Sequence, residues 1–250
     1  MKDDREKSVI NWNVLKHAYG GAADVPNLLD ALSSDAKDPV WDELWGRVCH
    51  QGTVYSASAP VLPFLLAAAR GWPPTARVMP LSLAGAIAIS QDASGEHDLQ
   101  PYQATIEALR ALAADTAACV DLTPIDFIYV LQASRALEGD VLWGQLLDRL
   151  ASGEFEGTCT SCASHLRIAI GEYGFFAASE EWVNRPSTLR IPLRPASEDD
   201  LHGVSALLYR QACAALQSST ADWLRYLFGF GICPACNRSF SVAGAIAATA

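Results

Sequence analysis

The sequence predicts a mainly α-helical protein in two parts: an array of stacked helix pairs over residues 1–152, followed by a small α+β module over residues 153–250. Three observations support this prediction. Apolar segments of helical length follow one another through the first part, separated by short polar links. A proline stands at the first helical position after Asp38 and again after Thr123, which is a common way to start a helix. The second part changes to short β-like runs and contains two C-x2-C pairs.

The expected helices follow from apolar spacing and from capping residues. After Asp38, apolar side chains at Val40, Trp41, Leu44 and Val48 recur at the spacing of one helix face. The same reasoning predicts helices in the first part at residues 24–34, 38–52, 56–71, 75–90, 101–115, 123–140 and 140–152. Two further helices are expected in the second part, at residues 199–219 and 219–231.

A weak internal repeat connects these helices. Residues 25–32 align with residues 62–69, about 37 positions later, and residues 104–113 give a looser third copy. Helix pairs that recur at roughly this period are typical of an α-solenoid, in which each pair buries its apolar stripe against the next pair.

Two phrases carry a narrower resemblance, His17–Leu29 and Cys49–Leu66. Over roughly residues 12–150 the chain resembles the HEAT-repeat family, and within it a group of HEAT-like bacterial proteins, although it lacks the regular Asp and Arg positions of the HEAT consensus. The resemblance implies a HEAT-like solenoid with a surface that grips another protein. The chain is similar in particular to immunity proteins of bacterial toxin systems. This resemblance implies that the protein binds and neutralises a cognate toxin.

The two C-x2-C pairs predict one structural zinc site. Each pair can close a tight knuckle that offers two thiolates to a tetrahedral ion. The spacer between the pairs is about 70 residues, against about 15–20 in the usual pattern. However, each pair follows a glycine and leads into a β-like run, at residues 165–176 and 238–242, as in a zinc ribbon interrupted by a helical insertion at about 177–228. The expected ligands are Cys159, Cys162, Cys233 and Cys236.

Other uses of these cysteines remain open on the sequence alone. Redox chemistry needs a thiolate at a helix N-terminus, and neither pair leads directly into an amphipathic helix. Disulfides are unusual in a chain that carries no apolar leader. A catalytic zinc ion keeps an open position, which four cysteines would close unless His165 replaced one of them. We expect His165 to face solvent or to cap the knuckle.

The charge of the chain and the length of its apolar runs indicate its type of partner and its location. The chain has 28 acidic and 18 basic residues, a net charge of −10, which argues against nucleic-acid binding and favours a partner with a basic surface. The N-terminus shows no signal peptide, so a cytoplasmic location is expected. The most apolar run, Val78–Ile89, is shorter than the roughly 20 residues that span a bilayer, so no membrane segment is expected.

The sequence shows no nucleotide-binding loop, zinc-protease motif or nucleophile elbow, and it therefore predicts a non-enzymatic protein. Polar and aromatic residues near helix ends are the candidates for contacting a partner: His17, Tyr19, Trp41, Trp45, His50, Gln51 and Tyr55. Two alternatives to an immunity protein stay open. One is a HEAT-like scaffold in a larger assembly, and the other is a hydrolase or nucleic-acid-processing enzyme that would use His17 or His50.

Overall fold

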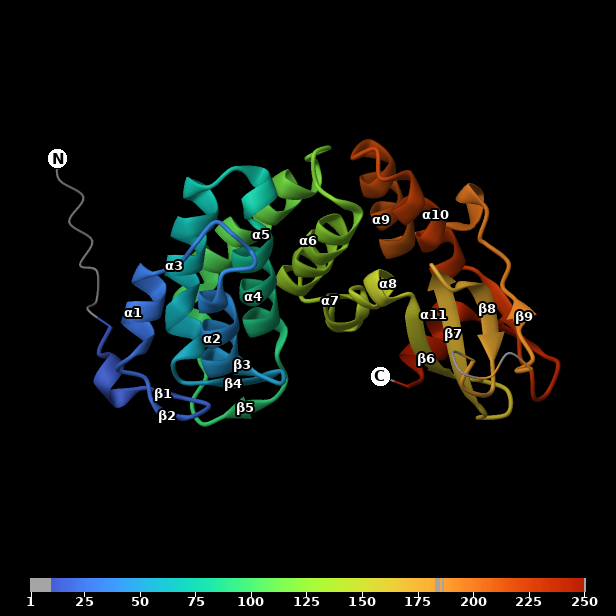
Figure 1. Ribbon diagram of the computed structural model, residues 1–250, viewed down its shortest axis with the longest axis horizontal. Helices are drawn as coiled ribbons and strands as arrows, with labels where there is room; N and C mark the ends of the chain where they lie inside the picture. The colour runs from blue at the N-terminus through green and yellow to red at the C-terminus, as the bar shows by residue number, and fades with distance from the viewer. Residues whose placement is uncertain (1–9, 183–184, 186, 250) are drawn as a thin grey trace. The chain divides into compact units, whose positions relative to one another are not determined.

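The computed structural model describes residues 10–182, 185 and 187–249 (Figure 1). The chain divides into two compact units, which are described separately below. The first unit comprises Met1–Ala114 with Ala133–Gly144, and the second comprises Asp115–Gln132 with Gln145–Ala250. The segment Asp115–Gln132 therefore belongs to the second unit although it lies within the first half of the chain.

Helices and very short strands alternate through the first part of the chain. The helices are α1 (Val25–Asp30), α2 (Pro39–Val48), α3 (Ser58–Gly71), α4 (Val78–Ile89), α5 (Gln103–Ala117), α6 (Pro124–Leu137), α7 (Val141–Leu146) and α8 (Arg149–Ser152). The strands are β1 (Lys16–His17), β2 (Gly20–Gly21), β3 (Cys49–His50), β4 (Thr53–Tyr55) and β5 (Ala93–Ser94).

The start of α2 confirms the capping prediction. The Asp38 side chain accepts a hydrogen bond from the Val40 N–H at 3.0 Å, and Pro39 occupies the first turn, where no N–H partner is needed. The helix ends at Val48, earlier than predicted, because Cys49 leaves the helical conformation and begins the β3–β4 hairpin. Local sequence thus fixed the beginning of this helix, while strand pairing fixed its end.

Close packing of α4, α6 and α7 forms part of the first unit's core. A Cβ atom at Gly85 would lie 3.1 Å from the Ala133 Cα, and one at Gly144 would lie 2.6 Å from the Ile89 Cδ1. Glycine at these two positions therefore lets the helices approach each other closely. Leu81, Leu83 and Ile87 of α4 are fully buried, as the apolar run predicts.

The second unit contains a four-stranded antiparallel sheet and a hairpin. The sheet has the order β6 (Glu154–Thr158), β7 (His165–Gly171), β8 (Gly174–Ala178) and β9 (Ile191–Pro192), and the hairpin pairs β10 (Phe230–Ile232) with β11 (Ser239–Ser241). Two backbone hydrogen bonds between Arg194 and Phe230, of 2.8 and 2.9 Å, link the hairpin to the β9 side of the sheet. A Cβ atom at Gly229 would lie 2.1 Å from the Arg194 carbonyl oxygen, so this junction requires a glycine.

The two faces of this sheet are covered differently. On one face lie α10 (Ser218–Leu227) and α11 (Val242–Ala247), with Phe175 stacked on Tyr226 at 4.0 Å between ring centroids. On the other face, Ala169, Phe176, Ala178 and Trp182 form a small apolar cluster. The Arg190 guanidinium lies 5.1 Å from the centroid of the Phe176 ring in this cluster. The remaining helix, α9 (Val204–Ala214), packs against α10.

The prediction of a mainly α, HEAT-like solenoid is wrong. The described residues form an α+β mixture, 51% helical and 16% strand, with four separate sheets. The aligned phrases 25–32 and 62–69 occupy different places in their helices: Pro26 lies in the first turn of α1, whereas Pro63 lies inside α3. The repeat in sequence is therefore not a repeat of the same structural unit.

Two further expectations differ from the structure. The segment expected as a helical insertion, about 177–228, holds α9 and α10 but also the end of β8 and all of β9, so it continues the sheet as well. The sequence of residues 241–250 by itself allows a tail or a final strand and turn, whereas Val242–Ala247 form α11, because the Ser241 hydroxyl accepts a hydrogen bond from the Gly244 N–H and starts a helix. Among the described residues, no helix is long and apolar enough to cross a membrane.

Candidate metal centre

The first cysteine knuckle is the turn that connects β6 to β7. The Cys159 N–H donates to the Ser164 carbonyl and the Ala163 N–H donates to the Cys159 carbonyl, both at 2.9 Å. Ala163 adopts a positive φ of 57°, which turns the chain back into β7 immediately after Cys162. These bonds hold both cysteine side chains at the tip of the hairpin.

The second knuckle connects β10 to β11 and repeats this geometry. The Cys233 N–H donates to the Arg238 carbonyl at 2.9 Å, and the Asn237 N–H donates to the Cys233 carbonyl at 3.0 Å. Asn237 has a φ of 60° and follows Cys236 directly. Two segments about 70 residues apart thus fold into the same cysteine-bearing turn.

The four sulfur atoms lie close together and could bind a metal ion. All four lie within 4.8 Å of one another, with the Cys159 and Cys236 Sγ atoms 3.9 Å apart and the Cys162 and Cys233 Sγ atoms 3.8 Å apart. A tetrahedron with metal–sulfur bonds of about 2.3 Å has edges of about 3.8 Å. A disulfide would need sulfur atoms about 2.05 Å apart, and all four cysteines are free.

The cluster is buried on one side and open on the other. Cys159 and Cys233, the first cysteine of each knuckle, are buried, whereas Cys162 is exposed and Cys236 is half-buried. The site therefore lies at the surface of the second unit with one pair of ligands anchored in its core. The Ser164 hydroxyl and N–H both bond to the Cys162 sulfur and lower the pKa of this thiol to about 6. The N–H of Arg238 favours the Cys236 thiolate, but burial and the other three cysteines outweigh it and raise the pKa of Cys236 to about 11.

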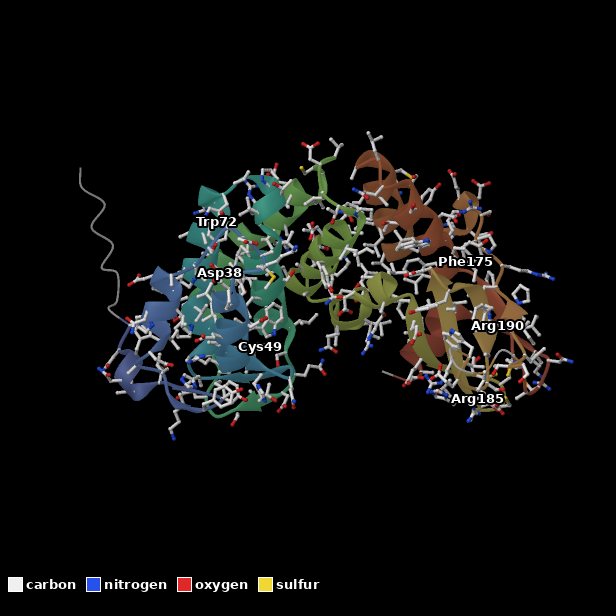
Figure 2. All side chains as sticks on the ribbon, viewed as in Figure 1. Asp38, Cys49, Trp72, Phe175, Arg185 and Arg190 are labelled. Carbon is white, nitrogen blue, oxygen red and sulfur yellow. The ribbon has the colours of Figure 1, made fainter. Side chains whose placement is uncertain are left out.

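His165 does not belong to this cluster. Its Nε2 atom lies 3.8 Å from the Glu156 Oε2, across the β6–β7 pair, and its side chain is 48% exposed. The remaining cysteines lie elsewhere: Cys49 is buried in the first unit (Figure 2), Cys119 is half-buried and Cys213 is exposed. Burial raises the pKa of the Cys49 thiol to about 11, as expected for a packing residue. The apolar spacing around Cys49, Cys119 and Cys213 predicts core packing for all three, and this prediction is wrong for the exposed Cys213.

His17 belongs to a second polar cluster, in the first unit. Its Nδ1 accepts a hydrogen bond from the Tyr19 N–H at 3.0 Å, so in the neutral ring the proton is on Nε2, which lies 3.0 Å from the Asp24 Oδ1. The Arg47 Nε donates to the other Asp24 oxygen at 2.7 Å. Both ring nitrogens of the buried His17 therefore have partners. This geometry is that of a residue that connects the β1–β2 hairpin to α1 and α2.

The two segments that carry the resemblance, His17–Leu29 and Cys49–Leu66, are in contact through Tyr19 and His50. The Tyr19 hydroxyl lies 3.3 Å from the His50 Nδ1, and the two rings are 5.5 Å apart in an edge-on arrangement. Tyr19 is 68% exposed, Gln51 is exposed at the β3–β4 turn, and Tyr55 is half-buried. Five of the seven candidate contact residues therefore lie on two neighbouring hairpins: His17 and Tyr19 on β1–β2, and His50, Gln51 and Tyr55 on β3–β4.

The two tryptophans in the candidate set do not share this surface. Trp41 is 1% exposed, and its indole N–H donates to the Ser33 carbonyl at 3.0 Å. Trp45 is half-buried against the same core. The structure therefore removes Trp41 from the residues that a partner can reach, because the apolar face that predicted α2 is the face that is buried.

Sequence reasoning missed Asp24 and Arg47 as members of the His17 cluster. The segment that begins at Asp24 has the same start pattern as the one at Asp38 and predicts a cap there, but the Asp24 side chain makes no cap hydrogen bond. Its two carboxylate oxygens bond to His17 and Arg47 instead. No short-range pattern links these residues, since Arg47 lies a whole helix away.

Comparison of the chain with protein-family models, with curated proteins and with solved structures finds no match. Its function must therefore be inferred from its own sequence and geometry.

Proposed function

We propose that the four cysteines bind one zinc ion and that this ion is structural. The observation that carries the proposal is the set of four sulfur atoms within 4.8 Å of one another. Four thiolates fill a tetrahedral shell and leave no position for water or substrate. Iron can occupy the same tetrahedral sulfur site, but zinc is the usual metal of two C-x2-C knuckles.

Elemental analysis of the purified protein tests the metal. One equivalent of zinc per chain is expected, in a colourless solution. If the protein is red and contains one equivalent of iron, the bound metal is iron and not zinc. If the protein contains no metal and chelation leaves its thermal transition unchanged, the proposal of a metal site is wrong.

For the protein as a whole, we propose a non-enzymatic binding function, most specifically that of an immunity protein that neutralises a cognate bacterial toxin. The net charge of −10 supports a partner with a basic surface. The resemblance of the segments His17–Leu29 and Cys49–Leu66 supports the immunity role, and the exposed Tyr19 and Gln51 lie within these two segments.

Co-expression with the protein encoded by the adjacent gene tests this function. A stable 1:1 complex is expected, in which the partner's toxic activity is lost. The matched variant is Tyr19→Ala, because Tyr19 is exposed and its loss should weaken the complex without unfolding the first unit. Two proteins that purify separately, with toxicity unchanged, would argue for a scaffold or another class of protein.

A further inference from the structure

We infer that the free edge of β6 is a docking site for an extended, basic segment of a partner protein, which would add a strand to the sheet. This inference rests on the proposed binding function and identifies a surface and a type of partner for it. The observations that support it are the unpaired backbone of β6, a hollow along this edge, and the charges on it.

The register of the sheet shows which backbone groups of β6 face outward. The Ile170 N–H donates to the Gly153 carbonyl at 3.0 Å, and the Cys159 N–H donates to the Ser164 carbonyl at 2.9 Å. In an antiparallel pair these bonded positions alternate, so every second residue of β6 points its N–H and C=O groups away from β7. Those outward residues are Glu154, Glu156 and Thr158.

This outer edge has no strand beside it in the described part of the chain. β6 is the first strand of the sheet, and β7 is its single neighbour there. No backbone hydrogen bond from Glu154, Glu156 or Thr158 to a residue outside the sheet is found among the described residues. Unpaired N–H and C=O groups in extended geometry are a template for another extended chain.

A hollow of about 320 Å³ runs along the same edge. Its walls come from both faces of the sheet: Glu156, Arg167 and Trp182 from one face, and Phe155 with Ile246 of α11 from the other. A hollow that reaches both faces at β6 must pass across its edge. Leu146, Arg149 and Thr249 complete the lining, and the Thr249 hydroxyl lies 2.8 Å from the Thr158 hydroxyl. The stretch of the edge that is open to another chain is therefore the one at Glu154 and Glu156.

One buried donor in this hollow has no partner. Trp182 is 3% exposed, and its indole N–H makes no hydrogen bond among the described residues. A buried donor without a partner costs free energy unless a ligand supplies an acceptor.

The hollow is lined by two arginines, Arg149 and Arg167, as well as by two glutamates, and Arg167 is paired with Glu181 at 3.3 Å. The charged residues on the edge strand itself are both acidic, and these would face an added strand directly. Glu154 and Glu156 lie on the same face of β6, and the Glu156 side chain is 61% exposed. An added strand would place side chains directly opposite these two carboxylates, so lysine or arginine is favoured there. The alternate positions would meet Phe155 and Ile246, which favour apolar side chains. A second copy of this chain fits poorly, because antiparallel pairing centred on Glu156 sets that carboxylate opposite its own copy.

The experiment uses the full-length, metal-loaded protein and a short acetylated peptide of alternating lysine and valine. Binding is measured by calorimetry, and backbone amide exchange is followed by NMR. Binding should slow the exchange of the Glu154, Glu156 and Thr158 amides at least about tenfold, while amides in α2 stay unchanged. A peptide of alternating glutamate and valine, and a lysine–valine peptide with N-methylated amides, should not bind.

Two variants separate strand addition from simple charge attraction. Glu156→Pro removes one outward N–H at an edge position that tolerates proline, and it should weaken binding about tenfold, equivalent to about 1.4 kcal/mol. The double variant Glu154→Lys, Glu156→Lys keeps the outward backbone groups of β6 and should reverse the preference for peptide charge. The glutamate–valine peptide should then bind, and the lysine–valine peptide should not. Retained metal and an unchanged circular dichroism spectrum show that each variant is folded.

The inference is overturned if the lysine–valine peptide does not protect the β6 amides, because the two glutamates would then serve only to keep the edge unpaired. Self-association through β6, seen as a concentration-dependent mass that Glu156→Pro abolishes, would also overturn it in favour of a second copy. If the partner binds wild type and Glu156→Pro equally, the proposed binding function stands and the edge of β6 is not its site. If the peptide binds but no partner protein is found, the edge of β6 binds extended basic segments and the proposed binding function is not supported.

Discussion

Ala163 and Asn237 occupy equivalent positions in the two cysteine knuckles, with φ angles of 57° and 60°. Each residue directly follows the second cysteine of its pair, and each donates its N–H to the carbonyl of the first cysteine. The two turns are therefore copies of one backbone geometry that presents two sulfur atoms, built from different residues.

This equivalence predicts different responses to glycine. The left-handed conformation costs roughly 1–2 kcal/mol for an ordinary residue, whereas asparagine tolerates it. Ala163→Gly should raise the free energy of unfolding of the metal-loaded second unit by about 1 kcal/mol, and Asn237→Gly should change it by less. Denaturant titration of the two variants measures the difference. A loss of stability in Ala163→Gly would show that the turn is not strained.

Removing one knuckle's ligands should unfold the second unit alone. Structural zinc supplies about 10–16 kcal/mol of binding free energy in small zinc domains, which is comparable to the whole stability of a domain. With Cys159→Ser and Cys162→Ser together, we expect loss of the metal, exchange of the β6–β8 amides at unfolded rates, and continued protection of α2 to α4. Elemental analysis and hydrogen exchange provide these measurements.

The matched control is Cys213→Ser, since Cys213 is an exposed cysteine of the same unit that lies outside the cluster. It should retain the full metal content and the wild-type exchange pattern. Loss of metal in this control would show that the removal of any thiol disturbs the unit, and the assignment of the four ligands would fail.

His17 should matter for stability and His50 much less. Replacing the buried His17 with alanine removes its ring and two hydrogen bonds, to the partly exposed Asp24 carboxylate and to the Tyr19 N–H, which should cost about 1–3 kcal/mol. His50→Ala removes one contact of 3.3 Å to an exposed tyrosine and should cost less than about 0.5 kcal/mol. If either variant instead abolished an enzymatic activity while thermal stability stayed unchanged, the enzyme alternative would gain support.

Asp24 should make the first unit sensitive to acid. Burial raises its pKa, but hydrogen bonds from Arg47 and His17 outweigh burial and hold the pKa below its ordinary value of 3.8. Because the pKa of Asp24 is lower in the folded state, its ionised form stabilises the fold fully at pH values above the ordinary pKa of 3.8. This contribution is lost as the pH falls from there through the lower, folded-state pKa. Between about pH 5 and about pH 3, wild type should lose more protection of the α2 amides than Asp24→Asn does. Equal losses would contradict this role of Asp24.

Short-range sequence signals predicted the helices well and the strands poorly. The cap at Asp38 and the buried run at α4 could be read from a few neighbouring residues, since capping and apolar periodicity act within one or two turns. In contrast, β1 and β3 are two residues long, too short for any alternation of apolar and polar side chains to show. Their phrases resembled helix ends, and this misreading contributed to the solenoid prediction.

The sequence by itself determined where α2 begins and which four cysteines share the geometry of a metal knuckle, because a cap and a C-x2-C turn depend on residues that adjoin each other. Only the tertiary structure decided that His17, Asp24 and Arg47 form one cluster, that Trp41 is buried, and that β6 has a free edge. Those features depend on partners far away along the chain, and no local pattern encodes which distant backbone or side chain a residue will meet.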